Sequence, residues 1–324
     1  MMLTELHIQN FRIFDDFEIS GLKRVNLIAG KNNTGKTTLL EAIRIYAAKD
    51  YSSVVNHILK QRGQFVPDRD SIYEHLFHNN NNKTYKSLLI NDLSIRHKSE
   101  SHAGFPKSDT AYHLFNIANN KNTAPIHLSR LYANKTADYP DDGLVYVPFG
   151  NYTQSIQELW DKIVLTDLED YVLRIIQTAI DPRILRIDVK ENNTKVRLKD
   201  VSAPVPLQTL GDGVIRILHL ALAIVNAKNS ILLIDELEAG LHHSVQEKLW
   251  ELLFEYCQKW NIQAFITTHS EDTLRTFSYI ATRPENETMG FFFRMQTIRD
   301  GKLEAIAYDM ERLQSALEIP IEIR

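Results

Sequence analysis

Residues 26–43 read NLIAGKNNTGKTTLLEAI, and this stretch decides the fold. Within it, residues 30–37 satisfy the pattern G-x-x-x-x-G-K-[ST]. Residues 25–29, VNLIA, form the continuous apolar run that a strand covered on both faces requires. The residues after the loop place apolar side chains on one side of a helix. A strand, a glycine-rich loop and a helix in this order predict a loop that binds phosphate.

Each residue type in this loop suits the binding of a nucleoside triphosphate. Gly30 and Gly35 let the backbone turn its N–H groups toward phosphate oxygens, and the start of the helix adds further N–H groups. We expect Lys36 to reach the β and γ phosphates and the Thr37 hydroxyl to ligate Mg²⁺. A glycine-rich turn without a ligand is the alternative. The residues predicted to bind ATP are Gly30, Lys31, Asn32, Asn33, Thr34, Gly35, Lys36, Thr37 and Thr38.

The composition is that of an ordinary globular chain. It has 324 residues, of which 44% are hydrophobic and 24% charged, so a large core is possible. A formal net charge of −4 gives no overall attraction to nucleic acid, and contact with DNA would need a local patch. The single cysteine, Cys257, excludes an intramolecular disulfide and suits a reducing cytosol. Because no signal peptide and no run of about 18 apolar residues occurs, we expect a cytoplasmic protein that does not contact membranes.

The remaining segments alternate between strand and helix patterns. Two alternating stretches within residues 3–19 predict strands before the loop, and residues 290–308 predict a hairpin near the end. Residues 50–125 are rich in Asn, Ser, Lys and His, and we expect strands and loops there. Within them, SLLINDLSIRH predicts a strand pair with Asn91 and Asp92 as its turn. Buried strands, intervening helices and antiparallel flanks predict an α/β fold.

A pair of acids ends a second buried strand. Residues 231–238 read ILLIDELE, so Asp235 and Glu236 follow an apolar run. At such a strand end Asp235 would place a carboxylate on the Mg²⁺ shell, and Glu236 could orient or deprotonate the attacking water. Acids at strand ends are common, so the pair alone is weak evidence. Together with the loop, it favours hydrolysis over a kinase reaction.

Two later features also point to phosphate. Residues 209–216, TLGDGVIR, are a glycine-rich helix start that would present free N–H groups. Their alternative is a glycine turn before a core helix. The segment FITTHS ends a third buried strand on His269, whose imidazole could donate a hydrogen bond to a γ-phosphate oxygen. A histidine at such a place is otherwise structural.

Taken in order, the loop, the glycine-opened helix, the strand with Asp-Glu and the strand with His resemble an ABC-type ATPase. The opening LTELHIQNFRIFDDFEISGLKRVNLIAGKNNTGKTTLLEAI is similar to the start of the RecF, SMC and OLD (overcoming lysogenization defect) branch of AAA family ATPases. The resemblance covers about residues 1–48 and 144–310. It implies an α/β fold, that of an ABC-type P-loop NTPase with a mixed or parallel core sheet, an antiparallel β flank and a helical signature lobe.

The resemblance implies a role for each motif. Residues 30–37 correspond to Walker A, Asp235 and Glu236 to Walker B, and EAGLHH to the loop after it. The implied catalytic residues are Glu236, Lys36 and His269, the last being the switch histidine. The implied Mg²⁺ ligands are Thr37 and Asp235.

In such proteins two nucleotide-binding domains sandwich two ATP molecules, so the signature of one subunit completes the site of the other. The resemblance therefore implies a homodimer that forms with ATP. The implied signature residues, which would act in trans, are Leu210, Gly211, Asp212 and Gly213. Gly211 stands where many ABC proteins have serine, which leaves the backbone N–H groups as the contact. Gln154 and Gln157 are the candidates for the glutamine loop.

The resemblance predicts one ABC-type ATPase domain over residues 1–324, in two lobes. Residues 1–150 and 228–324 would mainly form lobe I, with 50–125 as an insertion-rich region. Residues 151–227 would mainly form the helical lobe II with the signature. Only 55 residues follow His269, whereas the TOPRIM nuclease of OLD proteins needs about 100, a usual domain size. We expect the ATPase module alone.

The leading hypothesis is an ATPase, converting ATP and water to ADP and phosphate, that acts as a dimeric switch. By resemblance it would regulate an effector protein, a nuclease or toxin encoded nearby, in bacterial anti-phage defence. One alternative is an ATP-dependent DNA-binding clamp in repair or recombination; its nearest basic residues, which solvated side chains also explain, are Lys60, Arg62, Lys121, Arg130 and Lys135. A small-molecule P-loop kinase is disfavoured by Glu236, LGDG and His269 together.

Overall fold

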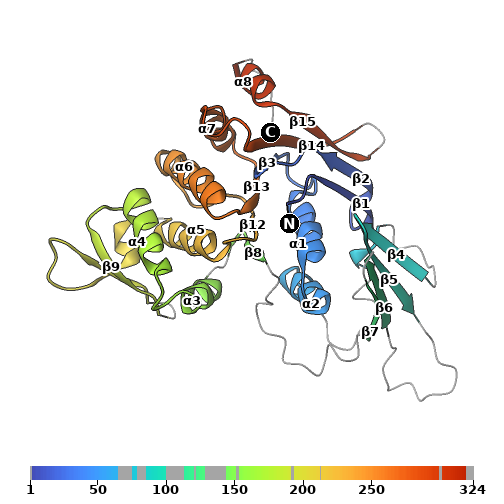
Figure 1. The fold of residues 1–324 in the computed structure, drawn as a ribbon, viewed down its shortest axis with the longest axis horizontal. Helices are drawn as coiled ribbons and strands as arrows, with labels where there is room; N and C mark the ends of the chain where they lie inside the picture. Colours follow the sequence, from blue (N-terminus) through green and yellow to red (C-terminus); the bar gives the residue numbers. More distant parts are fainter. Residues whose placement is uncertain are drawn as a thin grey trace.

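A six-stranded mixed sheet lies at the centre of the computed structural model, in the order β15-β14-β3-β13-β12-β8 (Figure 1). Its parallel strands are β8 (Leu144–Val147), β12 (Ile231–Ile234), β13 (Gln263–Thr268), β3 (Val25–Ala29) and β14 (Gly290–Thr297). The antiparallel strand β15 (Leu303–Tyr308) pairs with β14. The structure describes residues 2–64, 75–78, 85–99, 113–119, 122–127, 144–150, 153–190, 193–211, 213–298 and 301–318.

The register of the central strands brings distant segments to one edge of the sheet. Thr268 of β13 lies opposite Ala29 of β3, and Ile266 lies opposite Ile234 of β12. The carboxyl ends of these three strands therefore lie together, as parallel pairing requires. The loops that follow them begin at Gly30, Asp235 and His269. This edge is where ligands bind in open α/β sheets.

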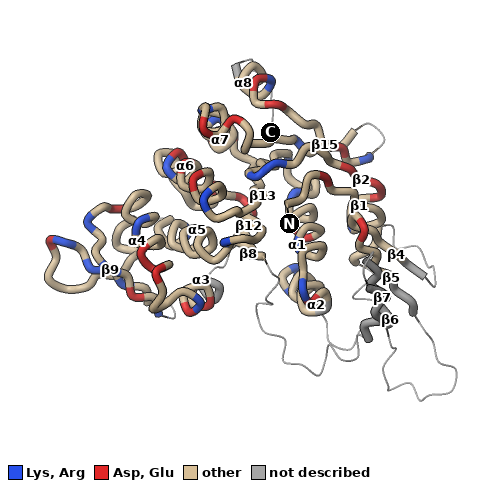
Figure 2. Tube along the Cα trace, in the orientation of Figure 1, with Lys and Arg blue, Asp and Glu red and all other residues tan. Residues whose placement is uncertain are grey.

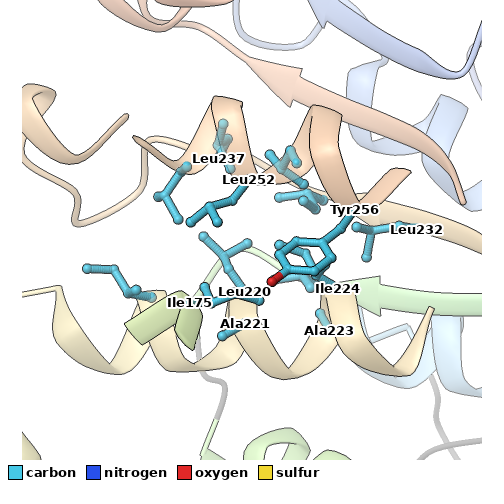
Figure 3. Close-up of a cluster of buried hydrophobic side chains, with 14 of the residues drawn as sticks. Ile175, Leu220, Ala221, Ala223, Ile224, Leu232, Leu237, Leu252 and Tyr256 are labelled. Carbon is cyan, nitrogen blue, oxygen red and sulfur yellow. The ribbon is translucent and has the colours of Figure 1, made fainter. Parts of the chain in front are cut away.

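Alternate side chains of the central strands enter two separate cores, because successive side chains of a strand point to opposite faces. Leu232 and Ile234 belong to the core shared with α3 (Thr153–Asp161), α4 (Leu168–Ala179), α5 (Val214–Asn226), α6 (His243–Lys259) and α7 (Glu271–Ala281). Ile231 and Leu233 belong to the core shared with α1 (Lys36–Ala47). Figure 3 shows part of the first core, where Leu232 lies among side chains from α4, α5 and α6. Both faces are covered, which explains the continuous apolar runs in the sequence.

An antiparallel sheet covers α1 on the side away from the central sheet (Figure 1). Its order is β2-β1-β4-β5-β6-β7. The strands are β1 (Glu5–Phe11), β2 (Phe14–Ser20), β4 (Tyr85–Ile90), β5 (Leu93–Ser99), β6 (His113–Asn119) and β7 (Asn122–His127). The strand pair predicted for SLLINDLSIRH is confirmed as β4 and β5, and its turn residue Asn91 has a left-handed backbone with φ of 51°.

The prediction of strands and loops alone for residues 50–125 is wrong at its start. Residues Tyr51–Gln61 form a helix, α2, which packs against α1. Val54, Val55, Ile58 and Leu59 recur at helical spacing and are buried. The Ser, Asn and His residues between them obscure this short period, and one of these polar residues, Asn56, is itself buried in α2.

A small sheet of the order β11-β10-β9 lies at the end of the molecule away from the antiparallel sheet, where β9 packs against α4 (Figure 1). The elements there are α3 (Thr153–Asp161), α4 (Leu168–Ala179), β9 (Ile184–Asp188), β10 (Lys195–Leu198), β11 (Val205–Pro206), the 3-10 helix η3 (Leu207–Leu210) and α5 (Val214–Asn226). Three more helices are α6 (His243–Lys259), α7 (Glu271–Ala281) and α8 (Met310–Glu318). No helix in the described ranges combines the length and the apolarity needed to cross a membrane.

We predict that Phe277→Ala destabilises the fold by about 3–5 kcal/mol, the usual cost of removing a buried phenyl ring. Phe277 is 0% exposed, and its ring lies 5.0 Å from that of Trp250 between α6 and α7. Urea unfolding measures the free energy of unfolding. Tyr279→Ala on the same helix is the control, because Tyr279 is 59% exposed, and we expect it to cost less than about 1 kcal/mol. Equal losses in the two variants would contradict the assignment of this core.

Candidate functional site

The loop between β3 and α1 is bent tightly around its glycines. A Cβ on Gly30 would lie 2.6 Å from the Met295 carbonyl oxygen and 2.7 Å from Thr34 Oγ1, so only glycine fits there. Gly35 has φ of 91° and immediately precedes the first residue of α1. The first turn of α1 therefore directs its free N–H groups into the loop. Such a helix terminus attracts an anion.

The middle of the loop uses asparagine in place of a further glycine. Asn33 has φ of 65°, a left-handed conformation that asparagine tolerates better than most residues. Lys31, Asn32 and Asn33 are exposed, whereas Thr34 is buried and donates its hydroxyl to the Lys31 carbonyl oxygen at 2.8 Å. The loop is thus fixed from within and open to solvent at its tip.

Lys36 lies across the inside of this loop. Its ammonium donates to the carbonyl oxygens of Gly30 at 2.6 Å and Lys31 at 3.0 Å. Burial lowers the pKa of Lys36, and the neighbouring carboxylates, Glu236 first among them, oppose that shift. The ammonium is thus a buried cation at the centre of an anion-binding loop.

Thr37 and Asp235 meet across the edge of the central sheet. The Thr37 hydroxyl donates to Asp235 Oδ2 at 3.0 Å, and the Thr267 hydroxyl donates to Oδ1 at 2.6 Å. Asp235 is only 5% exposed, and hydroxyl donors of this kind are what a buried carboxylate requires. Three segments far apart in the sequence are thereby joined by one carboxylate.

Glu236 has an unusual backbone conformation, with φ of 52°. A residue with a long side chain pays about 1–2 kcal/mol for a left-handed conformation. Its N–H donates to Thr267 Oγ1 at 2.8 Å, which fixes the turn directly after β12. Such strain at a polar strand end is found at functional sites. The turn directs the Glu236 carboxylate toward His269.

His269 lies between two carboxylates. Its Nδ1 is 3.3 Å from Glu236 Oε1 and 3.3 Å from Glu238 Oε1. Glu238 is held in turn, because its Oε1 accepts from the Thr268 hydroxyl at 2.8 Å and from the His269 N–H at 2.9 Å. The imidazole is half-exposed, so it can contact a ligand at this edge while Glu238 orients its loop.

The predicted signature residues lie where η3 passes into α5. Leu210 ends η3, Gly211 follows it, and Gly213 immediately precedes the helix with φ of 80°. A Cβ on Gly213 would lie 2.1 Å from the Gly240 carbonyl oxygen, so this turn packs closely on the loop after Glu238. Asp212 lies outside the described residues. The glycine-opened start of α5 is present as predicted.

The two glutamine candidates lie on α3, which follows β8. The Gln157 amide donates to Asp161 Oδ1 of the same helix at 2.8 Å. The side chain of Gln154 lies outside the part of the structure that is described. The described bond of Gln157 stays within α3, and the glutamine loop stays a prediction.

Thr38 borders an ionic cluster on the other side of the loop. Glu41 of α1 pairs with Arg12 at 2.9 Å and with Arg62 at 2.7 Å. The Arg62 guanidinium also approaches Thr38 Oγ1 at 3.4 Å. Arg62, considered above as part of a basic surface, is thus paired with a carboxylate.

Sequence reasoning missed three residues of this edge. Two of them lie within segments already assigned to the site: Thr267 is two residues before His269 in FITTHS, and Glu238 ends ILLIDELE. The third is Arg216 of α5, whose guanidinium donates to the carbonyl oxygens of Asp235 at 2.8 Å and Glu236 at 3.0 Å. Only the fold reveals Arg216, since a lone arginine in a helix carries no signal.

Residues 25–275 match the protein family described as "AAA domain, putative AbiEii toxin, Type IV TA system". An "ATP/GTP phosphatase" of Helicobacter pylori is 25% identical over 328 residues, which cover 86% of this chain and 88% of that protein. The DNA replication and repair protein RecF of Bacillus mycoides is 43% identical over 47 residues, 14% of this chain and 12% of that protein.

Solved structures of SMC heads share the fold. An SMC head bound to the C-winged helix domain of ScpA matches with a TM-score of 0.58 and 14% identity, over 98% of this chain and 100% of that one. The SMC head domain from Thermotoga maritima matches with a TM-score of 0.51 and 15% identity, over 95% and 99%. The predicted α/β fold of an ABC-type P-loop NTPase is confirmed.

We predict that Gly213→Ala disturbs the start of α5 more than Gly240→Ala disturbs the facing loop. Both glycines have positive φ, so both variants incur about 1–2 kcal/mol of backbone strain. Only at Gly213 would the added Cβ meet a backbone atom, whereas nothing lies within 4 Å at Gly240. Overpacking adds about 1–3 kcal/mol. Urea unfolding of both variants measures the difference, and equal destabilisation would contradict the close approach.

Proposed function

The chain belongs to the AAA-domain family that its residues 25–275 match, and it is an ATPase of the ABC type in the RecF/SMC branch; from this premise we propose that it is an ATP-hydrolysing dimeric switch. The observation that carries the proposal is the meeting of Thr37, Asp235, Glu236 and His269 at one sheet edge. The proposed reaction converts ATP and water to ADP and phosphate. Similarity to the "ATP/GTP phosphatase" of Helicobacter pylori supports hydrolysis.

In the proposed binding step, the loop from Gly30 to Thr38 receives the phosphates. Its N–H groups and the start of α1 contact phosphate oxygens. The Lys36 ammonium, which here bonds to the carbonyl oxygens of Gly30 and Lys31, would exchange these for the β and γ phosphates. The buried position of Lys36 strengthens its attraction for an anion, because solvent screens it less.

Thr37 and Asp235 have the donor set that Mg²⁺ prefers. A hydroxyl and a carboxylate oxygen lie 3.0 Å apart, and hard oxygen ligands together with phosphates and water suit this ion. In the described ranges no cluster of three or more His, Cys, Asp or Glu side chains could hold a metal by itself. The proposed Mg²⁺ site would therefore need phosphate oxygens of the nucleotide as further ligands. When bound, Mg²⁺ neutralises charge on the β and γ phosphates.

Glu236 and His269 are the proposed groups for the attack of water. The Glu236 carboxylate accepts a proton from water while the new bond to the γ phosphorus forms and the bond to the β–γ bridging oxygen breaks. His269 donates a hydrogen bond to a γ-phosphate oxygen. The 3.3 Å distance between His269 Nδ1 and Glu236 Oε1 supports joint action on one γ phosphate. Since Glu236 faces this position, water is a better acceptor than a second substrate.

A second copy of the chain would complete each site. In the proposed homodimer, residues Leu210 to Gly213 of one subunit contact the γ phosphate held by Lys36 of the other. The glycine-opened start of α5 supports this role, because its first N–H groups are free of helical partners. We further propose the two lobes expected above, with lobe II over residues 151–227. Closure on ATP and opening after hydrolysis would form the switch.

The output is proposed to be an effector protein encoded nearby, a nuclease or toxin in bacterial anti-phage defence. The matching family is described as a putative toxin of a "Type IV TA system", and a system of more than one component supports a protein partner encoded nearby. The second candidate is a DNA clamp, and the similarity to RecF over 47 residues favours it. Figure 2 shows basic and acidic residues interspersed along the described helices, and the formal net charge of −4 gives no overall attraction to DNA.

We predict that the two outputs are separated by adding ATP. If an effector is the output, the purified chain binds the product of an adjacent gene only with ATP and Mg²⁺. It then shows no ATP-dependent binding to duplex DNA at about 50 mM salt, where phosphate contacts are strong. Pull-down between purified proteins and a DNA mobility shift provide the two measurements. Salt-sensitive, ATP-dependent DNA binding without a protein partner would instead establish the clamp.

We predict that Glu236→Gln traps an ATP-bound dimer. The amide cannot accept the proton of water, so turnover should fall about 100-fold or more, while the phosphate-binding loop is untouched. Phosphate release measures turnover, and light scattering with ATP and Mg²⁺ measures the dimer.

Glu285→Gln is the matched control for Glu236→Gln. Glu285 is exposed and precedes β14, whose first residue lies opposite Val25 at the other edge of the sheet. This variant should hydrolyse ATP as the parent does. Unimpaired turnover in Glu236→Gln would remove Glu236 from the role of orienting water.

A further inference from the structure

We propose that Arg216 is a positioning residue that transmits the state of the signature helix α5 to Glu236. The inference rests on the proposed function, because it concerns when Glu236 can act on water. Arg216 belongs to neither the nucleotide-binding loop nor the signature residues. It joins the helix that follows the signature to the backbone that carries the water-orienting carboxylate.

The Arg216 guanidinium is fully inside the protein and binds backbone carbonyls of two loops. The side chain is 2% exposed. One terminal nitrogen donates to the Pro148 carbonyl oxygen at 2.8 Å. The other donates to the carbonyl oxygens of Asp235 at 2.8 Å and Glu236 at 3.0 Å. A single side chain thus holds the turn after β12 and the segment that leaves β8.

This arrangement exceeds what packing requires. The neighbours of Arg216 on α5, including Ile217 and Leu218, are buried in the apolar core. An apolar side chain would fill such a place without the several kcal/mol that burying a charge costs. The planar guanidinium, however, is able to donate to several oxygens in fixed directions. What the guanidinium provides over an apolar side chain is therefore the fixed placement of the carbonyl groups that it binds.

The residue that Arg216 holds is the one whose geometry matters most. Glu236 has a left-handed backbone, which is maintained only when its surroundings enforce it. The Thr267 hydroxyl holds the N–H of Glu236, and Arg216 holds its carbonyl oxygen. Both peptide groups of Glu236 are tied. The direction of its carboxylate therefore depends on Arg216.

Arg216 is placed to sense the signature. It is the third residue of α5, and Gly213 immediately precedes that helix. At about 1.5 Å of rise per residue, Arg216 lies about 4.5 Å along the axis from Gly213. A helix moves as a rigid body over so short a distance. When the γ phosphate bound to the second subunit attracts the start of α5, that helix would therefore move the carbonyl group of Glu236 with it.

The consequence is a requirement for the dimer before hydrolysis. With α5 engaged by the second subunit's nucleotide, Glu236 is aligned with water. With α5 free, the Arg216 bonds to the backbone of Glu236 are not fixed by a second subunit, and the carboxylate of Glu236 is not held on the attacking water. Binding of ATP to the glycine loop of one subunit is independent of this coupling, because Arg216 does not contact that loop through the bonds described.

The test compares Arg216→Met with Arg216→Lys and with Arg197→Met. Arg197 is an exposed arginine of β10, and Arg197→Met should hydrolyse ATP at the rate of the unsubstituted protein. Arg216→Met removes the bonds to the carbonyl oxygens of Pro148, Asp235 and Glu236, and we expect kcat to fall about tenfold or more, with KM for ATP within about threefold. The lysine, which cannot serve both loops, should give an intermediate kcat and serves if the methionine variant does not fold.

The decisive measurement is single-turnover hydrolysis by Arg216→Met in the Glu236→Gln background. If Arg216 acts through Glu236, the second change lowers the residual rate by less than about twofold. A further loss as large as in the parent background would show a merely structural role and overturn the inference. Parent kcat in Arg216→Met would overturn it as well.

These outcomes are distinct from a failure of the proposed function. If Glu236→Gln alone hydrolyses ATP at the parent rate, the role of Glu236 is wrong. If Glu236→Gln is slow and Arg216→Met keeps the parent kcat, only the coupling through Arg216 is wrong.

Discussion

The parallel alignment of β3, β12 and β13 is the constraint on which the rest of the structure depends. Because the three strands end at the same edge, the loops that follow them must share one small volume. The faces of the strands are buried in two cores, so few polar side chains lie within them, and Asn26 of β3 donates to the carbonyl oxygens of Lys23 and Ala264. Asp235 can remain there as a buried carboxylate because Thr37 and Thr267 each donate a hydroxyl. The geometry of the proposed nucleotide site follows from strand pairing and local hydrogen bonds.

The parts that sequence reasoning predicted are those in which backbone geometry demands a particular residue type. Gly30 is such a residue, since a Cβ would meet a neighbouring carbonyl, and so is Asn91 at the turn of a hairpin. Strands covered on both faces likewise require largely apolar runs, which is why β12, with ILLI, and β3, with VNLIA and its one polar residue Asn26, were recognised. In these places the local sequence contains the physical cause.

The parts that were missed are those whose cause is tertiary. Arginine is usually a surface residue, and only the packing of α5 against two loops buries Arg216. Glu238 was within a quoted motif, yet its partners Thr268 and His269 come from another strand. Helix α2 was missed because polar residues around Val54 and Ile58 obscure one short amphipathic period. Contacts across the fold cannot be read from spacing along the chain.

The position of β3 also has a consequence for synthesis on the ribosome. Both neighbours of this strand, β13 and β14, come from the last quarter of the chain. Translation adds about 5–20 residues per second, so the nascent strand waits many seconds with two open edges. Pairing over such sequence separations is also intrinsically slow. The glycine-rich loop that is made early can therefore take shape only late, and until then β3 is an unpaired apolar strand of the kind that is prone to aggregate.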